Sequence, residues 1–196
     1  MGSLAKSLNC DGRNGLSLLA SSVALALLAL PAAFMREHFA YAREPLLHGE
    51  AWRLFTGHFV HLDLSHALLN VVGLFLVWAL YRRAWGLAEW SVVVVTGMLA
   101  IDAGLWWLQP RVAWYVGASG VLHALIAAGV IGQWRTERGI AAVVAVLLGA
   151  KLLWEARHGA LPFAGESHDV VLSAHRYGAI GGALAAAALT LRRNWL

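Results

Sequence analysis

The chain contains six apolar stretches, and their length restricts its fold more than any other feature. They cover residues 16–34, 66–81, 90–108, 119–134, 140–154 and 171–191. A helix of about 20 apolar residues crosses the hydrocarbon core of a bilayer, and backbone groups in that core must be satisfied within helices or closed barrels. Charged residues make up only 13% of the 196 residues, against about 25% in soluble domains. The sequence therefore predicts an all-α membrane protein, a bundle of six transmembrane helices.

No linker, charge block or repeat of solenoid period divides the chain, so we expect one transmembrane domain over residues 1–196 with a short cytoplasmic tail at residues 1–14. A cleaved signal peptide is the alternative for residues 16–34, because the small residues Ala32 and Ala33 stand near the end of that run. The run is long for a signal peptide, which favours a retained first span.

The basic residues indicate how the bundle is oriented. When alternate loops are assigned to opposite sides, one side receives Lys6, Arg13, Arg82, Arg83, Arg135, Arg138, Arg192 and Arg193. This side is cytoplasmic by the positive-inside rule, which places both termini inside. The net charge of +4 is thereby explained by the bilayer as partner, and we expect no nucleic acid partner. The runs 66–81, 119–134 and 171–191 then all begin near the outer leaflet.

A serine between two glycines opens the fourth run, in the sequence Gly117-Ala118-Ser119-Gly120. Glycines let the backbone turn sharply and let another chain approach the hydroxyl, as a nucleophile requires. A helix-capping serine is the alternative, and so short a motif recurs by chance in unrelated chains. The hypothesis of a nucleophile therefore depends on which other groups lie near Ser119.

Polar residues of two other runs are expected at the same depth. His175 begins the sixth run, three residues before Gly178 in a small-residue stripe that continues through Gly182 and would let two helices pack closely. That packing would bring a base to the serine. His66 and Asn70 lie one turn apart on the second run, where they could donate hydrogen bonds to an oxyanion. Each alone is explained as a structural polar group, but together they predict an active site.

These residues resemble those of the rhomboid intramembrane serine proteases. The matching features are Trp52-Arg53-Leu54-Phe55-Thr56, His61 with His66 and Asn70 in the order His-x4-His-x3-Asn, Gly117-x-Ser119-Gly120, and Ala174-His175 with Gly178 and Gly182. Within that superfamily, the chain is most similar to rhombosortase. The similar features are its compactness, the Gly49-Glu50-x-Trp52-Arg53 segment, Gly-Ala-Ser-Gly-Val-Leu-His around the serine, and His-Arg-Tyr-Gly in the last run.

The resemblance implies a six-helix rhomboid-like bundle and a serine endopeptidase without cofactor or metal. It implies Ser119 as nucleophile, His175 as base in a dyad that needs no acid, and His66 and Asn70 as oxyanion donors. Gly117 and Gly120 shape the turn. His123 is a departure, because many rhomboids have an aromatic residue there that packs on the catalytic imidazole. A histidine could stack similarly, and it is the alternative candidate for the base.

Rhombosortase resemblance further implies a substrate class and a location. The substrates would be exported proteins, held by a single C-terminal helix that follows a Gly-Gly motif and precedes a basic tail. The enzyme would be a multi-pass protein of the bacterial inner membrane, with its site towards the periplasm. A general rhomboid protease with other single-span clients is the alternative.

Two further alternatives belong to different classes of function. A rhomboid that binds clients without cutting them is one. The other is a metal site built from His58, His61, His66, His168 and His175, since imidazole is a common ligand, although no carboxylate or thiol was expected beside them. Asp102 and Lys151 are two more charges within apolar runs, and we expect them to pair with each other across the bundle rather than face a polar cleft.

Overall fold

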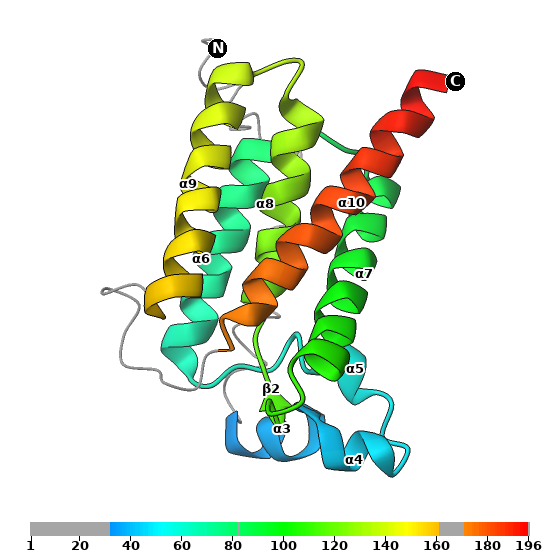
Figure 1. Cartoon of the computed structure of the whole chain (residues 1–196), viewed down its shortest axis with the longest axis vertical. Coiled ribbons are helices and arrows are strands. Elements are labelled where there is room, and N and C mark those ends of the chain that lie inside the picture. The colour runs from blue at the N-terminus through cyan, green and yellow to red at the C-terminus, as the bar shows by residue number, and fades with distance from the viewer. Residues whose placement is uncertain (1–31, 82, 161–170, 196) are drawn as a thin grey trace.

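A computed structural model describes residues 32–81, 83–160 and 171–195 as a helical bundle resting on a smaller cap of short elements (Figure 1). The bundle consists of α6 (Leu64–Tyr81), α7 (Leu87–Ala103) with its π-helical end η1 (Gly104–Leu108), α8 (Ser119–Gln133), α9 (Arg138–His158) and α10 (Ser173–Trp195). The cap consists of α3 (Ala32–Phe39), β1 (Tyr41–Ala42), α4 (Arg43–Leu47), α5 (Arg53–Thr56) and β2 (Trp114–Tyr115).

The bundle helices follow the last five predicted apolar runs closely. Three of them, Leu64–Tyr81, Leu87–Leu108 and Arg138–His158, are long and apolar enough to cross a membrane, and Ser119–Gln133 is a shorter apolar helix. The largest differences are in α9 and α10, which each continue four residues beyond their predicted ends at residues 154 and 191. The first predicted run, residues 16–34, lies outside the described residues except for its last three, so the count of six spans stays a prediction.

Local sequence signals explain where several helices begin and end. The Asp63 carboxylate accepts hydrogen bonds from the backbone N–H of His66 at 2.8 Å and from the Ser65 hydroxyl at 2.6 Å, which caps the start of α6. These bonds hold the pKa of Asp63 below its usual value. The Glu89 carboxylate accepts from the Gly86 N–H at 2.6 Å and caps α7 in the same way. Gly159, with φ of +83°, follows the end of α9.

Helix α8 lies at the centre of the bundle, and ten of its 15 residues are buried. Helix α10 crosses it diagonally, while α7 lies on one side and α9 on the other (Figure 1). The two helices cross so closely that only glycine fits on α10 at the contact. A Cβ on Gly178 would collide with the Gly120 carbonyl oxygen, and one on Gly182 with the Ala124 carbonyl oxygen. At these two positions α10 rests on the α8 backbone itself.

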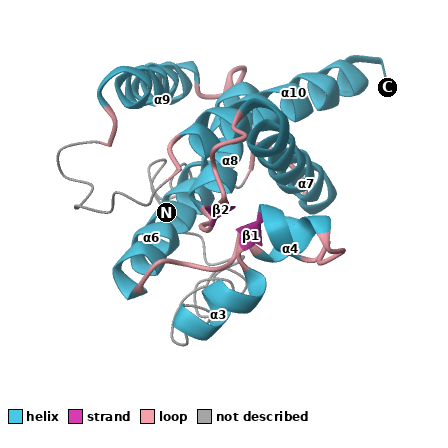
Figure 2. Cartoon of the chain, turned by 60° about the horizontal axis from the view of Figure 1, so that its bottom comes forward, coloured by secondary structure: helices cyan, strands magenta, loops and turns pink. Residues whose placement is uncertain are grey.

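The cap covers the end of the bundle at which α6, α8 and α10 begin, as Figure 2 shows. Its two short strands pair antiparallel, with Tyr41 opposite Tyr115. Buried Arg53 donates to the Ala40 and Glu37 carbonyls, both at 2.9 Å, and to the Glu50 carboxylate at 2.7 Å. One arginine thereby ties α5 to α3 and to the residue before β1.

The predicted pairing of Asp102 with Lys151 is wrong. Asp102 Oδ1 lies 3.3 Å from His58 Nε2 in the cap, and Lys151 Nζ lies 2.5 Å from Glu155 Oε1 on its own helix. The physical reason is the arrangement of the bundle: α8 and α10 lie between α7, which carries Asp102, and α9, which carries Lys151 (Figure 1). Each side chain therefore has a nearer partner than the other.

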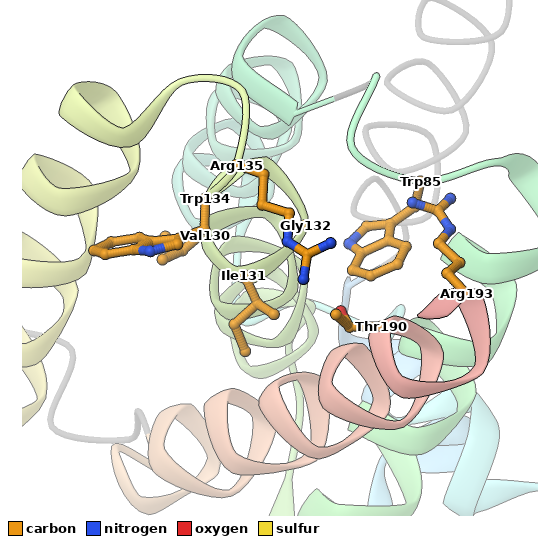
Figure 3. A pocket seen from close by; sticks show the side chains of 8 residues that line it. All are labelled: Trp85, Val130, Ile131, Gly132, Trp134, Arg135, Thr190 and Arg193. Atoms are coloured by element: carbon orange, nitrogen blue, oxygen red, sulfur yellow. The ribbon is translucent and has the colours of Figure 1, made fainter. Parts of the chain in front are cut away.

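The opposite end of the bundle holds a pocket of about 330 Å³ with a basic rim (Figure 3). Arg193 lies over the Trp85 ring at 4.5 Å and donates to the Glu89 carboxylate at 2.9 and 2.6 Å. The lining residues are Trp85, Val130, Ile131, Gly132, Trp134, Arg135, Thr190 and Arg193. Because α8 is 15 residues long, this pocket is about 20 Å from the end at which Ser119 lies.

The close crossing predicts which glycines the fold requires. Gly178→Ala should lower the free energy of unfolding by about 1–3 kcal/mol, because the added methyl group must push α10 away from the Gly120 carbonyl. Thermal unfolding in detergent measures the change. Gly149→Ala on α9 is the matched control, because a Cβ there meets nothing within 4 Å. Equal melting temperatures for the two variants would contradict the prediction.

Candidate active site

The turn before α8 presents the serine at the start of the helix. Gly117 has a φ of +125°, a backbone conformation that residues with a side chain rarely adopt. Its N–H donates to the Gly57 carbonyl at 3.0 Å, and its carbonyl accepts from the Tyr115 hydroxyl at 2.6 Å. The turn is thereby fixed to the cap on one side and to β2 on the other. Ser119 follows as the first residue of α8.

His175 lies directly opposite Ser119 on α10. Its Nε2 atom is 2.9 Å from Ser119 Oγ, within the range in which an imidazole can accept the hydroxyl proton. The two side chains are 56 residues apart in sequence and meet because the Gly178 contact, one turn further along α10, brings the helix backbones together. His175 is buried, with 5% of its surface exposed.

A carboxylate that the sequence did not lead us to expect lies behind His175. Glu155 Oε2 is 2.9 Å from His175 Nδ1, and its other oxygen lies 2.5 Å from Lys151 Nζ. The predicted run 140–154 ended one residue before Glu155, so this residue was not placed on a helix. The available signal was the spacing of Lys151 and Glu155, which puts opposite charges on one face of a helix continued by one turn.

His123 stacks on the face of the His175 ring. The two imidazole rings are 4.2 Å apart with an interplanar angle of 13°. The His123 ring therefore lies against α10, in the stacked arrangement that the sequence allows for a histidine at this position. Since a carbonyl can only accept, His123 Nδ1 donates to the Ser119 carbonyl at 2.7 Å. This hydrogen bond fixes the His123 ring to α8, and the face of the same ring packs against His175.

His66 reaches the nucleophile turn from α6. A Cβ on Gly117 would lie 2.8 Å from His66 Cε1 and 3.2 Å from its Nε2, so only glycine leaves room for this ring. The Leu62 backbone N–H donates to His66 Nδ1 over a long 3.5 Å. With Nδ1 as acceptor, the neutral ring carries its proton on Nε2, the nitrogen that faces the turn.

Asn70 lies one turn after His66 on α6. It is buried, with 4% exposed, and its Nδ2 group has no hydrogen-bond partner among the described residues. A buried amide donor without a partner is costly, about 1–3 kcal/mol. The next residue on this face, Gly73, packs against Leu122 of α8. The amide therefore lies on the α6 face that packs against the serine helix.

Of the five histidines considered as a metal site, the four that the structure describes do not form one cluster. His58 lies next to Asp102, and His61 is fully buried with its ring edge to face with His66. Burial, together with the nearby His66, lowers the pKa of His61 to about 4, so its ring is neutral at pH 7. His168 lies outside the described residues. Of the four described histidines, His66 and His175 lie at the serine site, on α6 and α10.

Within the described part of the chain, one group of side chains has the composition of a metal site. His123, Glu155 and His175 place their ligand atoms within 4.8 Å of one another. Two features disfavour a metal there. Nearly parallel stacked rings do not direct their nitrogens at one point, and the Lys151 ammonium lies 3.4 Å from His175 Nδ1, where it would repel a cation.

Taken together, the site presents a hydroxyl, a base and hydrogen-bond donors in a largely buried setting. Ser119 Oγ is in contact with a nitrogen that can take its proton, and the donors on α6 lie on the other side of the turn. This arrangement can carry out acyl transfer, in which a hydroxyl attacks a carbonyl and the resulting oxyanion is stabilised.

Known proteins are similar in sequence to part of this chain. The chain is similar to the rhomboid protease GlpG of Klebsiella pneumoniae, with 32% identity over 87 residues, and of Salmonella newport, with 33% over 90 residues. Each match covers 44% of this chain and 31% of the relative, so the chain matches about a third of the length of these curated relatives. The family model of the rhomboid domain matches residues 48–192, a range that includes Ser119, His175 and all five bundle helices up to residue 192. The chain therefore belongs to the rhomboid family.

Proposed function

We propose that this protein is an intramembrane serine endopeptidase with Ser119 as nucleophile and His175 as base. The observation that carries the proposal is the 2.9 Å contact between His175 Nε2 and Ser119 Oγ, made by side chains of two helices of a rhomboid domain. Membership of the rhomboid family and similarity to rhomboid protease GlpG support it. A rhomboid that binds clients without cutting them is disfavoured, because both groups are present in hydrogen-bonding geometry.

The reaction follows from this geometry. His175 Nε2 takes the Ser119 proton as Oγ bonds to the carbonyl carbon of the substrate, and the electron pair of the C=O bond moves to oxygen. The proposed donors to this oxyanion are His66 Nε2–H, the Asn70 amide and the Ser119 backbone N–H. The imidazolium then gives its proton to the leaving amine. In the second half of the reaction, His175 takes a proton from water as the water oxygen attacks the acyl carbon. It then returns the proton to Ser119 Oγ as the acyl bond breaks.

The proposed substrates are exported proteins anchored by one C-terminal helix. The site lies at the end of α8 covered by the cap, far from the basic rim of Arg135 and Arg193 at the opposite end. If that rim faces the cytoplasm, Ser119 lies near the outer leaflet of the bacterial inner membrane. A substrate helix would emerge from the bilayer at this depth. The rhombosortase-like residues favour a client with a Gly-Gly motif, an apolar helix and a basic tail.

The first test concerns nucleophile and base. Ser119→Ala and His175→Ala should each abolish cleavage of a client reporter, and the double variant should be no worse, because members of one catalytic unit are not additive. His123→Ala should keep measurable activity, and His123→Phe more, since a phenyl ring can still stack on His175. His158→Ala on α9 is the control. An inactive His123→Ala beside an active His175→Ala would reverse the assignment of the base.

The second test concerns orientation. A reporter that is active only outside the cytoplasm should be silent when fused after Leu196 and active when inserted after Ala160, in the loop that follows α9. The reason is that Arg135, Arg138 and the Arg192-Arg193 pair should hold their ends of the bundle inside. Colony assays of the two fusions at equal expression measure this. Opposite signals would place Ser119 near the cytoplasm and contradict an exported substrate.

The third test concerns why the client should present glycine. A peptide bond within a helix must unwind before it can be attacked, and freed backbone groups are costly in lipid. Glycine is about 1 kcal/mol less favourable than alanine in a helix and so unwinds more readily. Replacing the client's glycine pair by valine should slow cleavage at least about tenfold, which is about 1.4 kcal/mol of barrier. The ratio of trimmed to intact client measures this, and equal ratios would show that unwinding does not set specificity.

A further inference from the structure

Glu155 is an exception on the helix that carries it. Helix α9 is 21 residues long, yet only Ala141 and Glu155 are buried along it. Its apolar side chains, such as Val146 and Leu147, are among the most exposed of the bundle, as expected for a lipid-facing helix. A carboxylate buried at 8% exposure is costly in such a place unless it is paired. Glu155 therefore needs a partner that offsets the free-energy cost of burying its carboxylate.

The partner is the imidazole of the proposed base. Glu155 Oε2 lies 2.9 Å from His175 Nδ1 on the far side of the ring from Ser119. A carboxylate can only accept, so Nδ1 carries a proton and Nε2 presents its lone pair to the serine hydroxyl. The other carboxylate oxygen lies 2.5 Å from Lys151 Nζ, one turn earlier on α9. Both oxygens are therefore held, and the carboxylate has a fixed orientation.

From this chain of contacts, we propose that Glu155 is a positioning residue of the site. It orients the His175 ring towards Ser119, and Lys151 holds Glu155 in place. This rests on the proposed function of Ser119 and His175. When the Ser119 proton moves to Nε2, the imidazolium gains a positive charge facing the Glu155 carboxylate. The Nδ1 proton stays on the ring and Glu155 keeps its negative charge.

Lys151 makes the arrangement sensitive to charge. Its ammonium lies 3.4 Å from His175 Nδ1, and two donors at that distance repel once the ring becomes an imidazolium. The Glu155 carboxylate contacts both groups, one with each oxygen, and offsets this repulsion. Removing the Glu155 charge alone should therefore slow the reaction at Ser119 for two reasons: the His175 ring loses its acceptor, and it faces an uncompensated ammonium. Removing the charges of both Glu155 and Lys151 should slow the reaction less. A mere structural ion pair makes no such prediction about the rate at Ser119.

Labelling of Ser119 by a fluorophosphonate probe tests this without a known client. The purified full chain in lipid nanodiscs should label at Ser119, and Ser119→Ala should not. Glu155→Gln should lower the maximal labelling rate at least about 30-fold, while the probe concentration at half-maximal rate stays within about threefold. Lys151→Gln combined with Glu155→Gln should label at least about threefold faster than Glu155→Gln alone. Glu137→Gln, the same change at the exposed start of α9, is the matched control and should label as wild type.

The outcomes separate the two proposals. If wild type labels at Ser119 and Glu155→Gln labels within about threefold of it, the role of Glu155 is wrong and the proposed function stands. The role is also wrong if the double variant labels more slowly than Glu155→Gln. If wild type does not label at Ser119, the proposed function fails and the role of Glu155 fails with it. Melting temperatures of all variants show whether slower labelling follows from loss of folded protein. The double variant leaves no unpaired charge, so it should fold even if Glu155→Gln does not.

Discussion

The backbone contact between α10 and α8 is the interaction on which the rest of this structure depends. In lipid, helices gain little by burying apolar side chains against one another, so close packing of backbones carries much of the association. Gly178 rests on the Gly120 carbonyl, and Gly182 on that of Ala124. The same contact sets the separation of Ser119 and His175, because His175 is less than one turn from Gly178. Packing and the geometry of the site are therefore one constraint.

The sequence predicted most of the helices and the residues that meet at the serine. Long apolar runs locate a membrane helix with little ambiguity, because its length is set by the bilayer. Small residues at a spacing of four, as at Gly178 and Gly182, indicate where two such helices touch. The resemblance to rhomboid proteases added roles for individual residues, and the family match supports that resemblance at the level of the family. The specific substrate class stays a prediction.

Contacts between side chains of different helices could not be predicted in the same way. Asp102 was expected to pair with Lys151, but the sequence does not say which helices are neighbours, and each charge found a nearer partner. Glu155 was missed because hydropathy falls at the end of α9 while the helix continues. The stacking of His123 on His175 was foreseen only as one possibility, because it depends on how α10 packs against α8. Both errors, at Asp102 and at Glu155, concern tertiary neighbours.

The order of the site residues along the chain has a consequence for biogenesis. The turn at Gly117, the serine and the two donors on α6 all precede α9 and α10 in the sequence. Membrane helices are made and inserted from the N-terminus onward. A nascent chain in which α6 and α8 have already been inserted therefore holds its hydroxyl without a base, and stays so until α10 docks on the α8 backbone. With Ser119 as the proposed nucleophile and His175 as the proposed base, the docking of α10 is the step that activates the serine.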